Sequence, residues 1–208
     1  MNSRDEILNR VKNGIKIENL SEEKTQDPVK FILNDGDLYN EFKNRITENK
    51  AFLIENDDLE NSINEIIKKE NVKNLIYPNG LKIDIEKIKI DSKFKFDKSI
   101  DEFKEKIFDY DVSIINAKLG VSSHGIFAIT SNKTQPRLLS LTPKVCIVLI
   151  DKKTIVKSIS EALNKIKKED GRFPTNVVFI SGPSRTSDIE LQLVLGVHGS
   201  QIVYVLPY

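Results

Sequence analysis

The sequence has very little cysteine and histidine. Among its 208 residues, Cys146 is the only cysteine, and His124 and His198 are the only histidines. One thiol excludes an intramolecular disulfide, and a Cys-ligated iron–sulfur cluster needs several thiolates. A structural zinc site needs clustered ligands, whereas the two histidines are isolated in the sequence. We therefore expect neither a metal site nor an iron–sulfur cluster held by this chain alone.

The chain also lacks an apolar run of membrane-spanning length and a signal-peptide core at its charged amino end. We therefore expect a cytoplasmic protein with no membrane span. Neither sign of charge dominates, because the net charge is +1. The charge is uneven, however: residues 1–110 hold 20 basic and 24 acidic residues, and residues 111–208 hold 12 and 7. This gives little support to nucleic-acid binding and mild support to an anionic ligand in the second half.

The sequence does contain enough apolar residues for a substantial core. With 39% hydrophobic residues, this length predicts one α/β domain. Ser3 and Glu6 form a capping-box pattern ahead of apolar residues at helical spacing, which predicts an opening helix. A polar stretch follows it. We therefore expect a helix and linker over residues 1–30 and the domain over residues 31–208.

Predicted strands and helices alternate along the first half of the domain. Helices are expected around residues 38–46 and 59–67, and strands at 51–54 and 74–78. This alternation favours a three-layer α/β/α fold with a mostly parallel sheet. Residues 81–97 alternate only in part, so a short strand, a helix and a mobile hairpin all stay open for this segment.

The second half begins with a helix capped by Ser99 and a strand-rich stretch at 111–119. Gly120 and Gly125 then bound a bend, which predicts two short strands joined there. An apolar thiol-containing strand is usually buried, so we expect Cys146 to be buried and unreactive. The remaining predicted elements are strands at 126–130, 145–150 and 201–206 and a helix at 154–169.

Residues 177–199 form the most distinctive stretch. An apolar run at 177–180 predicts a strand, a Gly-Pro pair ends it, and a helical pattern follows over 188–196. Neither a Walker loop nor the glycine spacing of a Rossmann fingerprint is present. The start of such a helix, with its free N–H groups and nearby Arg185, suits a phosphate or carboxylate. The same hydroxyls are also ordinary helix caps, and Arg185 can pair with a carboxylate, so both interpretations stay open.

We expect these groups to form a cleft that prefers anions, because ligands of open α/β sheets bind at strand ends and the 122–125 bend lies at such an end. For a single histidine such as His124, a satisfied surface position is the more frequent finding. His198 can instead cap the carbonyls that end the predicted helix. No acid/base pair is recognisable, so no catalytic residue is assigned. The candidate ligand residues are Ser184, Arg185, Thr186, Asp188, Ser123, His124, Arg137 and His198.

The string Ser-Gly-Pro-Ser-Arg-Thr-Ser-Asp-Ile-Glu at 181–190, followed by Leu-Val-Leu-Gly-Val-His-Gly at 193–199, closely resembles the C-terminal signature of the lactate-utilisation protein C family. Residues 111–114, Gly125 and the run 137–148 look like the family's middle segment. The resemblance covers roughly the C-terminal half of the chain. Members are LUD-domain proteins, which implies a fold similar to the sugar-phosphate isomerase and CoA-transferase-like group.

The bend departs from the family pattern. Where the family usually has an acidic residue, Thr, Gly and Thr, this chain has Ser123, His124, Gly125 and Ile126. In CoA transferases, which the fold resembles, a glutamate near such a bend is the nucleophile that carries the CoA thioester. Ser123 has no paired base in the local sequence to activate it, so the resemblance does not extend to covalent acyl transfer.

The resemblance implies an accessory subunit of a cytoplasmic iron–sulfur oxidoreductase complex that oxidises L-lactate to pyruvate and supports growth on lactate. Its implied partners are a cysteine-rich subunit and a LUD subunit that carry the iron–sulfur clusters, so this chain is expected to bind no cofactor itself. The alternative is a stand-alone small-molecule enzyme or sensor for a phosphorylated, carboxylate or CoA-type anion. That alternative draws on the loop at 184–186 and on the basic second half.

Overall fold

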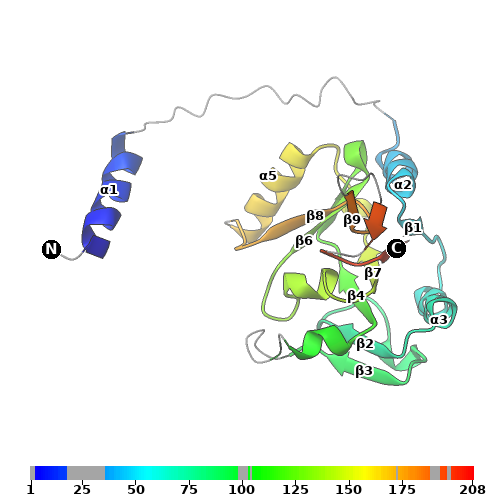
Figure 1. Ribbon diagram of the computed structural model, residues 1–208. Helices are drawn as coiled ribbons and strands as arrows, with labels where there is room; N and C mark the ends of the chain where they lie inside the picture. The colour runs from blue at the N-terminus through cyan, green and yellow to red at the C-terminus, as the bar shows by residue number, and fades with distance from the viewer. Residues whose placement is uncertain are drawn as a thin grey trace. The chain divides into compact units, whose positions relative to one another are not determined.

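The chain divides into two compact units, residues 1–31 and 32–208, and each is described by itself. The structure, a computed structural model, describes residues 3–17, 36–97, 103, 105–171, 173–187, 193–195 and 198–208 (Figure 1). In the first unit, the expected opening helix is present as α1 (Ser3–Ile17). Arg10 Nη2 donates to Glu6 Oε1 at 3.0 Å, one turn apart, which supports the helix. The linker expected after it lies almost entirely outside the described residues.

The second unit is built on a six-stranded parallel sheet in the order β1-β11-β7-β4-β2-β3. Its central strands are largely apolar, because both faces of a parallel sheet are covered. Val145 of β7 lies opposite Val112 of β4 and Ile202 of β11. The predicted α/β fold with a mostly parallel sheet is therefore confirmed. The strands are β1 (Phe52–Leu53), β2 (Asn74–Tyr77), β3 (Ser92–Lys95), β4 (Val112–Asn116), β7 (Val145–Ile150) and β11 (Ile202–Pro207).

Two amphipathic helices cover the two faces of this sheet. On one face, α3 (Leu59–Glu70) buries Ile63 and Ile66 in a cluster with β2, β4, β7 and β11. On the other face, α2 (Leu38–Glu48) buries Phe42 and Ile46 in a second cluster. Both helices start at an aspartate whose side chain accepts backbone N–H groups of the first turn. Their apolar residues recur at helical spacing, which is why the sequence predicted them.

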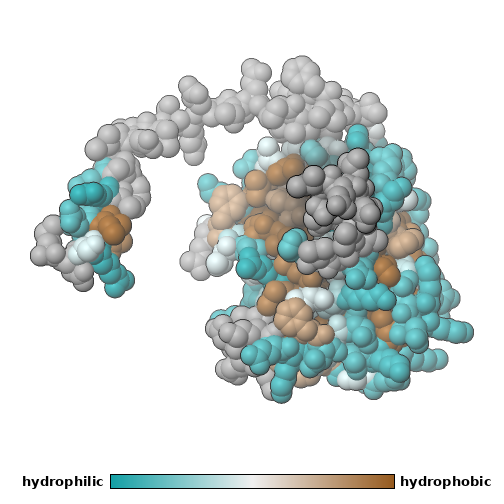
Figure 2. Space-filling view, in the orientation of Figure 1, coloured by the Kyte–Doolittle hydropathy of each residue, from teal (hydrophilic) through white to brown (hydrophobic). Residues whose placement is uncertain are grey.

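The face with α2 also carries a small antiparallel sheet in the order β5-β6-β8. Phe127 and Ile129 of this sheet point into the main core, and Ala128 packs with Ala162 and Ile166 of α5 (Ile159–Asp170). This side of the molecule is therefore thicker than a single helical layer. All four residues of β8 are only partly buried, and Figure 2 shows apolar surface over this region. The strands are β5 (Leu119–Val121), β6 (Ile126–Thr130) and β8 (Val177–Ile180).

Some local predictions differ from the structure. The segment left open at 81–97 forms a 3-10 turn, η2 (Ile85–Lys87), and the edge strand β3. Helix α5 begins at Ile159 and not near residue 154, because Ser158 caps it and Lys152–Thr154 form a separate 3-10 turn, η6. The start of the helix expected after Ser99 lies outside the described residues. None of the helices that the structure describes is long and apolar enough to cross a membrane.

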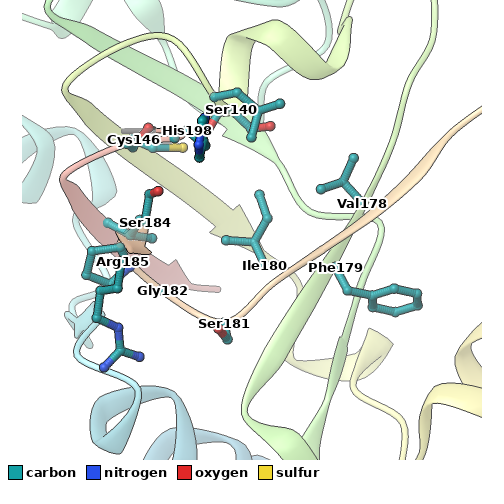
Figure 3. Close-up of a pocket in the computed structure, with 15 residues that line it drawn as sticks. Ser140, Cys146, Val178, Phe179, Ile180, Ser181, Gly182, Ser184, Arg185 and His198 are labelled. Carbon is teal, nitrogen blue, oxygen red and sulfur yellow. Dashed lines mark hydrogen bonds between the residues drawn. The ribbon is translucent and has the colours of Figure 1, made fainter. Parts of the chain in front are cut away.

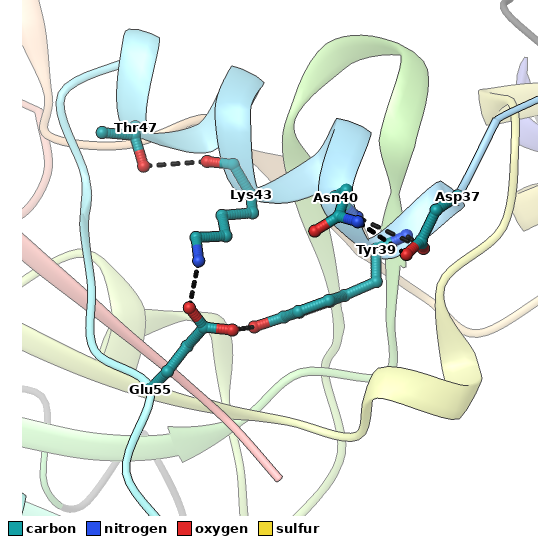
Figure 4. A network of polar contacts seen from close by, with 6 residues as sticks. All are labelled: Asp37, Tyr39, Asn40, Lys43, Thr47 and Glu55. Atoms are coloured by element: carbon teal, nitrogen blue, oxygen red, sulfur yellow. Dashed lines mark hydrogen bonds and ion pairs between the residues drawn. The ribbon is translucent and has the colours of Figure 1, made fainter.

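A polar network fixes α2 against the chain that follows β1 (Figure 4). Glu55 accepts hydrogen bonds from Tyr39 Oη, at 2.6 Å, and from Lys43 Nζ. Asp37 holds the first turn by accepting from Tyr39 N at 2.9 Å and from Asn40. These contacts position α2. Its C-terminal end, at Asn49, contacts two segments described below, the bend at 122–125 and Arg185.

The network predicts an acid-sensitive contribution to stability. The pKa of Glu55 lies below its ordinary value of 4.5, chiefly because of the hydrogen bonds from Lys43 and Tyr39. A carboxyl group with a lowered folded pKa stabilises the protein above its unfolded pKa, and this stability is lost as the pH falls through the folded pKa. Below pH 4.5 we expect the free energy of unfolding to fall less steeply with pH in Glu55→Gln than in wild type. The difference should be at most about 1 kcal/mol, since the carboxylate is 40% exposed. Urea unfolding at a series of pH values measures this, with the exposed Glu48→Gln as control; parallel curves for Glu55→Gln and wild type would refute it.

Candidate functional site

The distinctive stretch forms a strand, a loop and a hairpin. After β8, residues of β9 (Arg185–Ser187) pair antiparallel with β10 (Leu193–Leu195), and Leu195 lies opposite Arg185. The prediction of a helix over 188–196 is therefore wrong for residues 193–195, and residues 188–192 lie outside the described part. Leucines at 191, 193 and 195 alternate in a way that fits a strand as well as a helix, and pairing with β9 decides between them. The anion site at a helix start loses its structural basis in the described residues.

A pocket of about 420 Å³ lies beside this loop (Figure 3). Cys146 and Val203, the second residues of β7 and β11, line it, which places it at the amino ends of these strands. Ligands of open α/β sheets bind at the carboxyl ends, so this pocket lies at the opposite edge from the expected one. Its polar lining residues are Ser140, Ser181, Ser184, Arg185, His198 and Ser200.

Hydrogen bonds to main-chain carbonyls hold the pocket together. Ser184 N donates to Ser200 O at 2.8 Å, and Ser200 Oγ donates to Ser140 O at 3.2 Å. Ser140 Oγ in turn donates to Arg137 O at 2.7 Å. The hydroxyls of Ser140 and Ser200 are thus engaged with main-chain carbonyls. Ser184 and His198 are the predicted ligand residues that this pocket brings together, beside the backbone of Arg185.

The Arg185 guanidinium is engaged with α2. Figure 3 shows its side chain directed away from Ser140 and His198 toward the helix, and its Nη2 donates to Asn49 O at 3.2 Å. Asn49 is the C-cap of α2, where the helix dipole is negative and a cation is favoured. The neighbouring Gly182 has φ +145°, and a Cβ there would lie 2.5 Å from Asn49 O. The loop therefore lies directly against the end of α2.

This contact predicts a structural effect of Arg185. We expect Arg185→Ala to lower the free energy of unfolding by about 1 kcal/mol, because it removes a hydrogen bond and a positive charge from a helix C-terminus. Arg185→Lys keeps the charge and is expected to recover part of that loss. Urea unfolding followed by circular dichroism measures both. Unchanged midpoints together with weakened anion binding would instead assign Arg185 to a ligand.

The bend at 122–125 contacts the same helix end. It forms a 3-10 turn, η4 (Ser122–His124), between β5 and β6, so the two strands and bend predicted there are confirmed. Asn49 Nδ2 donates to His124 O at 2.9 Å and to Gly125 O at 3.0 Å. The bend and the loop thus meet at Asn49. Neither Ser123 nor His124 lines the pocket beside Ser184.

Ser123 does have a neighbouring base, contrary to the sequence-based expectation. Its Oγ lies 2.7 Å from His124 Nδ1. Adjacent residues on a 3-10 turn bring these atoms together, which the sequence order did not reveal. Ser123 is only 3% exposed, however, and its N–H donates to Lys157 O at 3.2 Å. Because this hydroxyl is almost fully buried, we assign no nucleophilic role to the pair.

The other predicted ligand residues are dispersed. Arg137 lies on η5 (Arg137–Ser140) and lines a separate hollow of about 640 Å³ with Pro136 and Leu138. Thr186 belongs to β9, but its side chain and the whole of Asp188 lie outside the described residues. Asn49 was not predicted as part of the region; its only sequence signal is its place after the apolar periodicity of α2.

Cys146 is buried, as predicted, with 1% exposure. Burial raises the pKa of its thiol to about 12, and the thiolate is the reactive form. We expect a thiol reagent to label the folded protein at neutral pH far more slowly than the urea-unfolded protein. A comparison of the two labelling rates by mass spectrometry tests this, and rapid stoichiometric labelling of the folded chain would contradict it.

The described residues offer little to a metal or cluster. Within the described residues, no three side chains of His, Cys, Asp or Glu lie together in a way that could hold a metal ion. A single buried thiol does not fit a cluster that requires several thiolates. The residues of this chain therefore do not fit the iron–sulfur groups that the resemblance implies for the complex.

Known proteins similar to this chain include several lactate-utilisation proteins. An uncharacterized protein of Neisseria meningitidis is 35% identical over 112 residues, which cover 53% of this chain and 48% of that protein. A Lactate utilization protein C of Shouchella clausii is 37% identical over 91 residues, 43% of this chain and 40% of that protein. One from Oceanobacillus iheyensis is 33% identical over 100 residues, 46% and 43%. The chain thus matches less than half the length of each of these relatives.

The fold also has a solved counterpart. The crystal structure of a DUF162 family protein from Deinococcus radiodurans superimposes with a TM-score of 0.59 over 84% of this chain and 98% of that one. At 19% identity this likeness shows the fold alone. The LUD domain matches residues 39–206, from the second residue of α2 almost to the end of β11. Because this match covers most of the sequence, the chain belongs to the LUD-domain family.

Proposed function

We propose that this chain acts in lactate utilisation, as an accessory subunit of a cytoplasmic iron–sulfur oxidoreductase complex that oxidises L-lactate to pyruvate. The observation that carries the proposal is the similarity to proteins named Lactate utilization protein C, at 33–37% identity over 91–100 residues. Membership of the LUD-domain family over residues 39–206 supports it.

The chemistry explains why partners are part of the proposal. Oxidation of lactate to pyruvate breaks the C–H bond of the hydroxyl-bearing carbon and the O–H bond of its hydroxyl group. It forms a C=O bond and releases two electrons and two protons. The electrons need an acceptor, and the one thiol of this chain is buried with a raised pKa. We therefore place the iron–sulfur clusters in partner subunits and assign no redox step to this chain.

A stand-alone enzyme or sensor that binds a phosphorylated, carboxylate or CoA-type anion is the second candidate. The pocket of about 420 Å³ beside Ser184 and His198 favours it. The bond from Arg185 to Asn49 O weighs against it, because the nearest guanidinium is directed to a helix end and not to a ligand.

Reconstitution separates the two candidates. The chain is purified with and without its candidate iron–sulfur partners, and lactate-dependent dye reduction is measured for the complete mixture and for mixtures that lack one component. We expect activity only when this chain is present, and its return when the purified chain is added back. Undiminished lactate oxidation without this chain would exclude the subunit role. A thermal-shift screen of the chain alone tests the alternative, for which a large shift with a phosphorylated metabolite and none with lactate is expected.

A further inference from the structure

A second pocket lies at the carboxyl ends of β2 and β4. It has a volume of about 460 Å³ and is lined by Asn79, just after β2, by Asn116, the last residue of β4, and by residues 130–132, 134 and 135. The sheet order places β2 beside β4, while the chain continues from β2 to β3 on one side and from β4 to β7 on the other. Open α/β sheets bind their ligands in the crevice at such a point of divergence. The position is therefore that of a binding site.

The wall of this pocket is held rigidly by its own hydrogen bonds. The buried amide of Gln135 accepts from Asn116 N at 3.0 Å and donates to Asn116 O at 2.9 Å. Asn132 Oδ1 accepts from Thr134 N at 2.9 Å, Thr134 Oγ1 at 3.0 Å and Gln135 N at 2.7 Å. The loop is thus fixed across the end of β4, which is the preorganisation that lowers the entropic cost of binding.

Two polar side chains of the lining each have a buried atom with no hydrogen-bond partner among the described residues. Asn116 Nδ2 donates to Gly80 O at 3.0 Å, which fixes the orientation of the amide and leaves Oδ1 as its free acceptor. Asn116 Oδ1 and Ser131 Oγ are both buried and have no hydrogen-bond partner within the described residues. A buried polar atom left in this way costs free energy, and native proteins satisfy nearly all of them with protein, water or a ligand. Both residues line the pocket, so a ligand hydroxyl that displaces the atoms covering them can donate to Asn116 Oδ1 and exchange a hydrogen bond with Ser131 Oγ.

Among the described residues of this lining, the positive charge of Lys118 is compensated. Lys118 Nζ lies 2.9 Å from Asp170 Oδ1 and 3.2 Å from Glu169 Oε2, at the end of α5. Two carboxylates beside one ammonium leave no excess positive charge to attract an anion. The remaining lining is mostly amides and hydroxyls, which recognise a ligand by hydrogen bonds and not by its net charge.

We propose that this pocket binds a small neutral molecule rich in hydroxyl groups, of the polyol or monosaccharide class. Hydroxyls both donate and accept, so they match an array of fixed amides and the free acceptor of Asn116. The volume lies within the range of small-molecule sites. The inference goes beyond the proposed function, because it concerns a different site and a different ligand class from the lactate anion.

The test uses the full chain and two matched serine variants. Ribose, glucose and inositol are titrated as neutral probes, and L-lactate and inorganic phosphate as anions, by calorimetry and by NMR of the side-chain amides. We expect a neutral probe to bind and to shift the Asn116 and Gln135 amide signals. Ser131→Ala should weaken that binding by about fivefold, the loss of one hydrogen bond, without lowering the urea midpoint, because the hydroxyl has no hydrogen-bond partner among the described residues. Ser181→Ala, in the pocket beside Ser184, should leave the affinity unchanged.

Three results would overturn the proposal. The first is that none of the neutral probes shifts these amides. The second is that lactate or phosphate shifts them while the neutral probes do not. The third is that Ser131→Ala lowers stability and leaves the affinity as it was, which would make the hydroxyl structural. None of these results bears on lactate-dependent dye reduction, so this proposal and the subunit role fail independently.

Discussion

Gly125→Ala is expected to lower the free energy of unfolding by about 3 to 5 kcal/mol, the sum of a left-handed backbone penalty and a steric clash. Gly125 has φ +57°, and a Cβ built there would lie 2.4 Å from the backbone carbon of Arg45 and from Ile46 N. Both neighbours are main-chain atoms inside α2, so neither can move without displacing the helix. Relief of the clash would also break the bonds from Asn49 Nδ2 to the bend.

A matched glycine separates the two contributions. Gly171 has φ +69°, and nothing lies within 4 Å of a Cβ placed there. Gly171→Ala therefore carries the backbone penalty alone and should cost about 1 kcal/mol. Urea unfolding by circular dichroism compares the two variants with wild type. Equal losses at the two positions would mean that the bend does not press on α2 as described.

The bend shows which part of the fold the sequence could predict. Gly120 and Gly125 around a polar segment, with apolar runs outside them, are local signals for two strands and a turn, and these elements are present. The contact of Gly125 with Arg45 joins residues 80 positions apart, and neither local sequence contains a signal for it. Periodicity therefore located the elements but not the contacts between them.

The candidate site shows the same division more sharply. The hydroxyls and arginine of residues 184–187 were expected at a helix start, but residues 185–187 form β9 and pair with β10. The leucines at 191, 193 and 195 are compatible with both a helix and a strand, and only pairing with β9 selects the strand. Arg185 was weighed as a ligand or as a structural residue; its partner, Asn49 O, is 136 positions away.

The pocket at the carboxyl ends of β2 and β4 was not predicted at all. Its parts come from four separate segments, and none carries a titratable pair or a known motif. The available signal was weaker: Asn79 directly follows the strand predicted at 74–78, and Asn116 lies within the strand-rich stretch predicted at 111–119. In a parallel sheet such residues gather at one edge, so strand order, which the sequence did not provide, was needed to see that β2 and β4 are neighbours.

In the described contacts, the C-terminal end of α2 touches two segments: the loop at 181–185, here called the signature loop, and the bend at 122–125. Asn49 binds the bend through its side-chain amide and Arg185 through its carbonyl, and Gly182 and Gly125 allow both segments to approach the helix. The small antiparallel sheet links the same segments from the other side, since β6 begins after the bend and β8 ends at the loop. A change in this sheet should therefore affect both the free energy of unfolding and the pocket beside Ser184.

Phe127 is the residue of that sheet most suited to test this coupling. It is fully buried, lies opposite Ile180 of β8 and Gly120 of β5, and belongs to the main core cluster with Phe42 and Val148. Phe127→Ala removes the ring and leaves a cavity, which costs about 3 to 5 kcal/mol in well-packed cores. For a domain of this size we expect a fall in the melting temperature of roughly 6 to 20 °C.

The exposed Phe108 provides the matched control, because its side chain is 70% exposed and the same substitution there leaves no cavity. Phe108→Ala should change the free energy of unfolding by less than about 0.5 kcal/mol. Amide hydrogen exchange adds a local measurement: in Phe127→Ala, protection should fall in β6 and in β8 together, because their backbone bonds share the lost support. Loss of protection confined to β6, with β8 protected as in wild type, would show that Phe127 does not couple the sheet to the signature loop.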